Sequence, residues 1–126
     1  MPHLVLEYSG NVRDDIRSGP LLRELHGVLA LAGGFRVQDF KGRAVRMADY
    51  AIGDGSIEQA FVNLDLRTFA GKSDELKQAI SQAALDVLVR AFSRTMAETA
   101  CDISVQITEL DRVSYARARS QDAVTS

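Results

Sequence analysis

The feature that most constrains the fold is a strand-helix-strand pattern that occurs twice along the chain. In the first half, residues 3–8 form a short apolar run typical of a buried strand, and residues 18–32 carry apolar side chains at helical spacing. Ser18 is expected to cap this helix, and the glycines at 33–34 end it. Residues 40–47 predict the strand that completes the unit.

The second half repeats this order of elements. Residues 60–67 alternate apolar and polar side chains, which indicates a half-buried strand. Ser73, followed by two acidic residues, predicts a capped start for a long helix whose apolar stripe continues to Phe92. Residues 103–108 alternate again and predict the fourth strand.

Two such units side by side predict an α+β fold, more narrowly an α/β two-layer sandwich. Its mixed four-stranded sheet would carry both helices on one face. A chain of 126 residues has room for one domain of this kind. We expect residues 1–112 to form that domain and residues 113–126, which are poor in apolar side chains, to be a flexible C-terminal tail.

Helices on one face leave the other face of the sheet uncovered. We expect Phe61, Phe69 and Tyr50 to help fill this open face. Copies of the same chain can bury an exposed sheet face most simply, so the pattern predicts a closed homo-oligomer.

Composition excludes several classes of partner. The formal net charge of −2 gives no general attraction to nucleic acid, and the basic run at 116–120 is too brief to change this. No apolar run approaches the roughly 20 residues that span a bilayer. A single cysteine and the absence of a leader-like start favour the cytoplasm. No acidic residue completes a metal site with His3 or His26, so no metal is expected.

The N-terminus offers one candidate catalytic group. Pro2 follows Met1 directly, and removal of Met1 would expose the proline nitrogen as a secondary amine. A chain amine has a pKa of about 7.7–8.0, and burial or nearby cations lower it toward the range suited to a general base. The plainer alternative is that Pro2 only sets methionine removal.

Several short stretches carry a resemblance to a known family. They are the opening "MPH" with "LVLEYS", "ALAGGF" at 30–35, "KGRAVR" at 41–46, "AIGDG" at 51–55 and "AFVNLDLRTFAGKS" at 60–73. Together with two halves of about sixty residues, they make residues 1–110 resemble the tautomerase superfamily. Within it, the chain is similar to the 5-carboxymethyl-2-hydroxymuconate isomerase family.

This resemblance implies a homotrimer that needs no cofactor and takes part in aromatic-compound catabolism. Pro2 would act as general base and then acid, moving a proton in an unsaturated 2-oxo or 2-hydroxy dicarboxylate such as 5-carboxymethyl-2-hydroxymuconate. In the family, arginines at two positions hold the substrate carboxylates. In an alignment without gaps, lysines occupy these positions here, Lys41 and Lys72. Lysine keeps the charge but lacks the two-pronged grip of arginine, and Arg43, on the same strand face as Lys41, could supply part of it.

Two other functions stay open. The lysines, and the absence of the polar tract usual after the last strand of the family, are compatible with a non-catalytic trimer that binds small acids or serves assembly. If Met1 is retained, the nitrogen of Pro2 is an amide and cannot accept a proton. Alternatively, Pro2 could act as an acid that activates the addition of water to an unsaturated acid.

Overall fold

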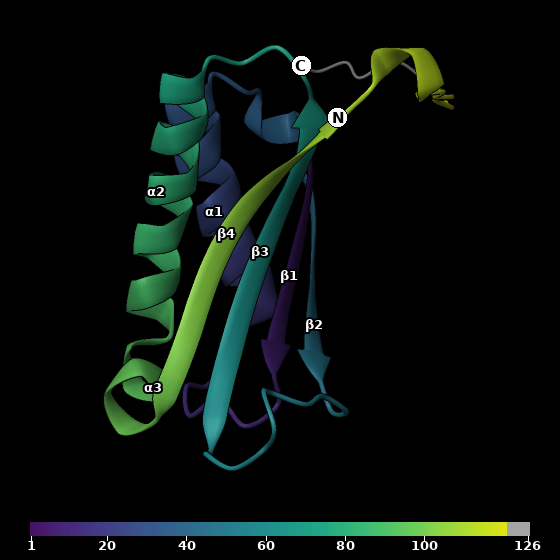
Figure 1. Ribbon diagram of the computed structural model, residues 1–126. Helices are drawn as coiled ribbons and strands as arrows, with labels where there is room; N and C mark the ends of the chain where they lie inside the picture. Colours follow the sequence, from purple (N-terminus) through teal and green to yellow (C-terminus); the bar gives the residue numbers. More distant parts are fainter. Residues whose placement is uncertain (121–126) are drawn as a thin grey trace.

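The computed structural model describes residues 1–120, and a four-stranded sheet forms its centre (Figure 1). The strands are β1 (His3–Ser9), β2 (Lys41–Met47), β3 (Gln59–Phe69) and β4 (Ala100–Leu110). Their order in the sheet is β2-β1-β3-β4. β1 is parallel to β2 and β3 is parallel to β4, whereas β1 and β3 are antiparallel. This arrangement confirms two β-α-β units that meet at the centre of a mixed sheet.

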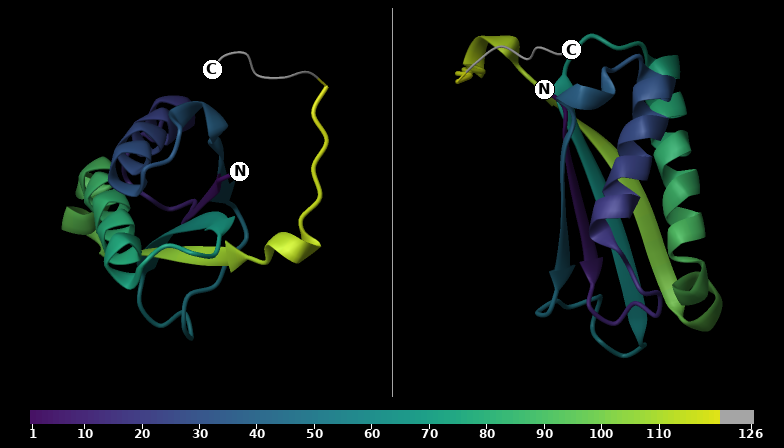
Figure 2. Two further views of the ribbon diagram at one scale, coloured as in Figure 1. Left: turned by 90° about the horizontal axis from the view of Figure 1, so that it is seen from above. Right: turned by 180° about the vertical axis from the view of Figure 1, so that it is seen from behind.

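The helices lie together on one face of this sheet (Figures 1 and 2). They are α1 (Ser18–Gly33), α2 (Asp74–Ala91) and the short α3 (Ser93–Glu98), and single 3₁₀ turns span Val37–Asp39 and Arg112–Ser114. The predicted α+β two-layer fold is therefore confirmed, with α3 as an addition. Among the helices of residues 1–120, none has the length and apolar character that a bilayer span requires.

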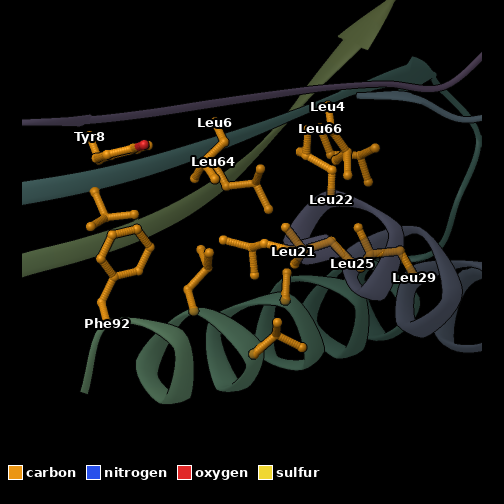
Figure 3. Close-up of a cluster of buried hydrophobic side chains, with 14 of the residues drawn as sticks. Leu4, Leu6, Tyr8, Leu21, Leu22, Leu25, Leu29, Leu64, Leu66 and Phe92 are labelled. Carbon is orange, nitrogen blue, oxygen red and sulfur yellow. The ribbon is translucent and has the colours of Figure 1, made fainter. Parts of the chain in front are cut away.

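The core lies between the two layers. Alternate residues of β1 and β3 point toward the helices, and the register pairs Leu4 with Leu66 and Leu6 with Leu64. Leucines of α1 and apolar residues of α2 pack against them, as Figure 3 shows. The buried residues of the two central strands alternate with less buried ones along the chain. This alternation in the sequence is therefore enough to predict which side chains of the sheet face the core.

The two helix starts differ from each other. Ser73 caps α2 as predicted, because its hydroxyl oxygen accepts a hydrogen bond from the backbone N–H of Leu76 at 3.2 Å. The prediction that Ser18 caps α1 is wrong: Ser18 is already helical, and Arg17 occupies the cap position without a side-chain hydrogen bond. The Arg17 carbonyl accepts the N–H of Leu21 at 3.1 Å, so the helix begins one residue earlier than expected.

The open face of the sheet carries aromatic side chains at its two ends. Tyr50 contacts Phe61 edge-on near one end, with ring centroids 6.1 Å apart. Tyr115 contacts Phe69 near the other end, at 5.0 Å and an interplanar angle of 89°. The aromatic residues predicted for this face therefore lie there, and Tyr115 from the C-terminal segment joins them.

Polar side chains occupy the middle of the open face. The amide of Asn63 donates to Ser104 Oγ at 2.9 Å and to Gln106 Oε1 at 2.8 Å. The hydroxyl of Thr108 donates to Asp65 at 2.7 Å. A second copy placed on this face would therefore meet a hydrogen-bonded polar ladder, flanked by aromatic residues, rather than a continuous apolar surface.

The chain turns back toward the domain after β4. Asp111 accepts the backbone N–H of Val113 at 3.1 Å and so stabilises the last 3₁₀ turn. Tyr115, which packs on Phe69, belongs to the segment expected to be a tail. The flexibility of residues 113–126 stays a prediction, and its last part, residues 121–126, lies outside the described residues.

Candidate functional site

Pro2 is buried at the beginning of β1, at the end of the sheet where the N-terminus lies (Figure 1). Its carbonyl accepts the backbone N–H of Lys41 at 3.2 Å, one position before the first pair of the β1–β2 register, His3 with Lys41. Pro2 lines a cavity of about 450 Å³ at this edge. Strand pairing therefore fixes the start of the chain beside a space that a small molecule could enter.

Four separate segments build this cavity. They are residues 1–2, the loop at 34–39 after α1, residues 68–72 at the end of β3, and Arg112 after β4. β1 runs antiparallel to β3, and β3 is parallel to β4, so the start of β1 meets the ends of both at one edge. Gly34 and Gly71 have φ values of 72° and 128°, a region that favours glycine, and they permit the turns on either side.

The cavity is positively charged. Arg36, Lys72 and Arg112 line it, and Asp39 is its one acidic residue. Within residues 1–120, none of the three cations forms an ion pair with a carboxylate. Unpaired cations in a concave site favour anions, and carboxylates above all when an arginine can bind both oxygens.

Aromatic rings hold two of these cations. The ammonium of Lys72 lies 4.2 Å from the centre of the Phe35 ring and 3.4 Å from the carbonyl oxygen of Gly33. The guanidinium carbon of Arg112 lies 4.2 Å from the centre of the Phe69 ring. These cation–π contacts place both charges without neutralising them.

The terminal amine is kept less basic than usual. With Met1 present, burial lowers the pKa of this amine, and the charge of Lys41 lowers it further. Arg117 and Arg119 act in the same direction, whereas Asp39 raises it. A lowered pKa leaves more of an amine unprotonated near neutral pH, which is the state in which it can accept a proton.

The structure places the residues singled out in the sequence at different distances from this site. Lys72 lines the cavity with Pro2. Lys41 lies beside the terminal amine, and its ammonium donates to the carbonyl of Asp39 at 3.1 Å. Arg43 lies on the open face of the sheet, outside the cavity lining, and donates to Nδ1 of His3 at 2.9 Å.

Three charged residues of the cavity are not among the site residues that the sequence predicts. Arg36 and Asp39 belong to the loop after α1, and Arg112 follows β4. The predicted topology contained the signal for Arg112, since parallel strands end at the same edge of a sheet. A charge directly after β4 must therefore lie near residues 68–72 at the end of β3.

A larger hollow, of about 880 Å³, lies between α2 and β4. It is lined by Ile103, Val105 and Ile107 of the edge strand and by polar side chains of α2. Glu75 and Lys77 are its ionisable groups, so it offers less chemistry than the Pro2 cavity. In the described part of the chain, no cluster of three metal-ligating side chains occurs.

Comparisons with known proteins agree with this fold. The crystal structure of a 5-carboxymethyl-2-hydroxymuconate isomerase from Deinococcus radiodurans R1 is similar at 34% identity and a TM-score of 0.85, covering 94% of this chain and 90% of that one. The 5-carboxymethyl-2-hydroxymuconate Delta-isomerase of Escherichia coli is 26% identical over 110 residues, 87% of each chain. The structure of "Q0 fused 4-OT wild type symmetric trimer" shares the fold at 19% identity and a TM-score of 0.67, covering 96% and 95%.

A mixed sheet of two β-α-β units, with Pro2 lining a cationic cavity at its edge, defines a protein of the tautomerase superfamily. Residues 2–122 match the model of the 5-carboxymethyl-2-hydroxymuconate isomerase family, and the chain belongs to that family. This membership supports an isomerase function.

Proposed function

We propose that the protein is a cofactor-independent isomerase that moves a proton within an unsaturated 2-oxo or 2-hydroxy dicarboxylate, such as 5-carboxymethyl-2-hydroxymuconate. The observation that carries this proposal is the position of Pro2 in a cavity with three cations and one acid. The name of the Escherichia coli relative supports the choice of substrate.

In this mechanism the nitrogen of Pro2 is the general base, once Met1 has been removed. It accepts a proton from the enol oxygen, or from the carbon next to the carbonyl, and the electron pair left behind shifts along the conjugated system. The same nitrogen then returns the proton at another carbon, so substrate and product differ only in the place of one proton and one double bond. Nearby cations stabilise the negative charge that develops on the substrate oxygen.

The cations of the site have separate roles in this proposal. Lys72, in the cavity, binds a substrate carboxylate, and Lys41 lowers the pKa of the amine. Arg43 contacts His3 on the open face and lies outside the cavity lining, so in this proposal it reaches a substrate where copies of the chain meet. Such a contact requires an oligomer, and we propose a homotrimer because the chain shares its fold with a protein described as a symmetric trimer.

The direct test is the ketonisation of phenylenolpyruvate, a simple enol, by protein whose intact mass shows that Met1 is absent. We expect a rate above the spontaneous one that increases in proportion to protein concentration, because the proline nitrogen is then a free amine. A Met1-free protein that leaves both phenylenolpyruvate and 2-hydroxymuconate at their spontaneous rates would contradict the proposal and favour the non-catalytic trimer.

The pH dependence of kcat/KM should respond to Lys41. Its charge lowers the pKa of the terminal amine when Met1 is present, and we expect it to act in the same direction on the Pro2 amine that removal of Met1 exposes. Lys41→Gln should therefore raise the pKa of the Pro2 amine and leave less of the base unprotonated at a given pH. The acidic limb of the pH profile is therefore expected to move to higher pH in Lys41→Gln. The measurement is kcat/KM for phenylenolpyruvate between about pH 5 and 9, a range that brackets the ordinary pKa of a chain amine.

Two matched variants test whether the direction of this shift depends on the position of the charge. Asp39 raises the pKa of the amine, so Asp39→Asn should move the acidic limb to lower pH, opposite to Lys41→Gln. Arg43→Gln also removes one positive charge from β2, but this charge contacts His3 and not the terminal amine. The acidic limb of the pH profile of Arg43→Gln should therefore stay where it is in the wild type. Equal shifts in Lys41→Gln and Arg43→Gln would show that net charge, not the position of Lys41, sets the limb.

A further inference from the structure

We propose that Arg112 is a specificity-determining residue, whose guanidinium binds a second carboxylate of the substrate, and that Phe69 and Tyr115 position it. This inference rests on the proposed function for its substrate class, but the binding of a dicarboxylate can be tested without turnover. None of these residues was among those singled out in the sequence for the site.

Two aromatic side chains hold Arg112 in place. Its guanidinium carbon lies 4.2 Å from the centre of the Phe69 ring, and Tyr115 packs against that ring edge-on at 5.0 Å. A cation–π contact acts through the charge of the guanidinium, and the N–H donors that point away from the ring stay free. The side chain is therefore positioned in advance while its donors remain available to a ligand.

The charge of Arg112 has no competing anion in the part of the chain that the structure describes. Within residues 1–120, no carboxylate forms an ion pair with Arg112. Its neighbour Asp111 instead uses one carboxylate oxygen to accept the backbone N–H of Val113. The guanidinium thus lines the cavity without a carboxylate partner from the described residues, and its charge is available to bind an anionic ligand.

The other cations of the cavity, Arg36 and Lys72, are less suited to bind a carboxylate than Arg112 is. Lys72 presents a point charge that already donates to the Gly33 carbonyl at 3.4 Å. Arg36 and Arg112 are both exposed, but no aromatic ring of the described residues holds Arg36 as Phe69 holds Arg112. A guanidinium, unlike the ammonium of Lys72, can bind both oxygens of a carboxylate at once. Of the two arginines in the cavity, Arg112 is the one that an aromatic contact positions, so it is the group best able to recognise a carboxylate.

Lys72 and Arg112 can each bind one carboxylate, and this predicts a preference for substrates with two carboxylates. A substrate with one carboxylate can be held by Lys72, and it gains nothing from a second cationic group. A substrate with two carboxylates gains a charged hydrogen-bonded contact, worth about 1.5–3 kcal/mol in proteins, or about 10- to 100-fold in affinity. The cavity would then prefer dicarboxylates because of Arg112.

The kinetic test compares 2-hydroxymuconate, which has two carboxylates, with phenylenolpyruvate, which has one. We expect Arg112→Gln to lower the ratio of their kcat/KM values by about 10- to 100-fold. Arg112→Lys should recover only part of this loss, and Phe69→Leu should lower the ratio by a smaller factor. Arg90→Gln, which removes an arginine on α2 that pairs with Glu24 away from the cavity, should leave the ratio unchanged.

A binding measurement separates this inference from the proposed function. Calorimetry with trans,trans-muconate, a dicarboxylate without an enol, should give about 10- to 100-fold weaker binding to Arg112→Gln than to the wild type. If the protein proves inactive while muconate binding depends on Arg112, the inference stands and the proposed function fails. If enols are turned over but neither the ratio nor the muconate affinity changes in a folded Arg112→Gln, or if the wild type binds no muconate, the inference is overturned.

Discussion

Pro2→Ala is expected to lower kcat/KM for the ketonisation of phenylenolpyruvate by at least about 100-fold. A positioned general base contributes about 10²- to 10⁴-fold to a proton transfer. Alanine at position 2 still permits removal of Met1 and leaves an amine, but without the ring that fixes the backbone angle of proline the nitrogen can rotate. Position, rather than the presence of an amine, is therefore what this variant removes.

A protein that retains Met1 is the matched control for Pro2→Ala. In it the ring is intact but the nitrogen of Pro2 is an amide, so the loss should reach the upper part of the same range. Neither change should alter the fold, because the backbone contact of Pro2 with Lys41 uses the proline carbonyl and not its nitrogen. Circular dichroism and intact mass verify the two proteins, and equal rates in the wild type and both variants would remove Pro2 from the mechanism.

The periodic elements of the fold could be predicted because their burial follows local sequence. In β3, the alternation of Val62, Leu64 and Leu66 with polar residues is the alternation of buried and half-buried positions in the structure. The short helix α3 could not be predicted in this way. Asp14 accepts the backbone N–H groups of Arg94 and Thr95 at 3.0 and 2.9 Å, a contact across about eighty residues that no local pattern contains.

The difference between local patterns and long-range contacts also explains which residues of the site could be predicted. The sequence identifies Pro2 because a proline at the chain start is chemically unusual, and Lys72 is identified through the resemblance. Arg36 and Arg112 lie on separate segments that meet only when the strands have taken their order in the sheet. They lie close to Pro2 because of the strand order, and no local sequence pattern predicts this proximity.

Phe92→Ala is expected to cost about 3–5 kcal/mol of the free energy of unfolding, the usual range for a fully buried phenylalanine. Phe92 is 0% exposed, and its ring lies 5.5 Å from that of Tyr8 at an angle of 59°. Its backbone links two helices, since its N–H donates to Leu88 at 2.9 Å and its carbonyl accepts from Met96 at 3.0 Å. Alanine keeps these bonds, so the loss measures the cavity left between α2 and the sheet.

The measurement is urea denaturation of the wild type, Phe92→Ala and Phe92→Leu at one protein concentration, because assembly of copies would add to the apparent stability. Leucine fills more of the space and should lose less than alanine does. Domains of this size unfold with about 5–15 kcal/mol, so the alanine variant would keep only a fraction of the native stability. A loss below about 1 kcal/mol in Phe92→Ala would mean that the junction of α2 and α3 repacks around the smaller side chain and leaves little cavity.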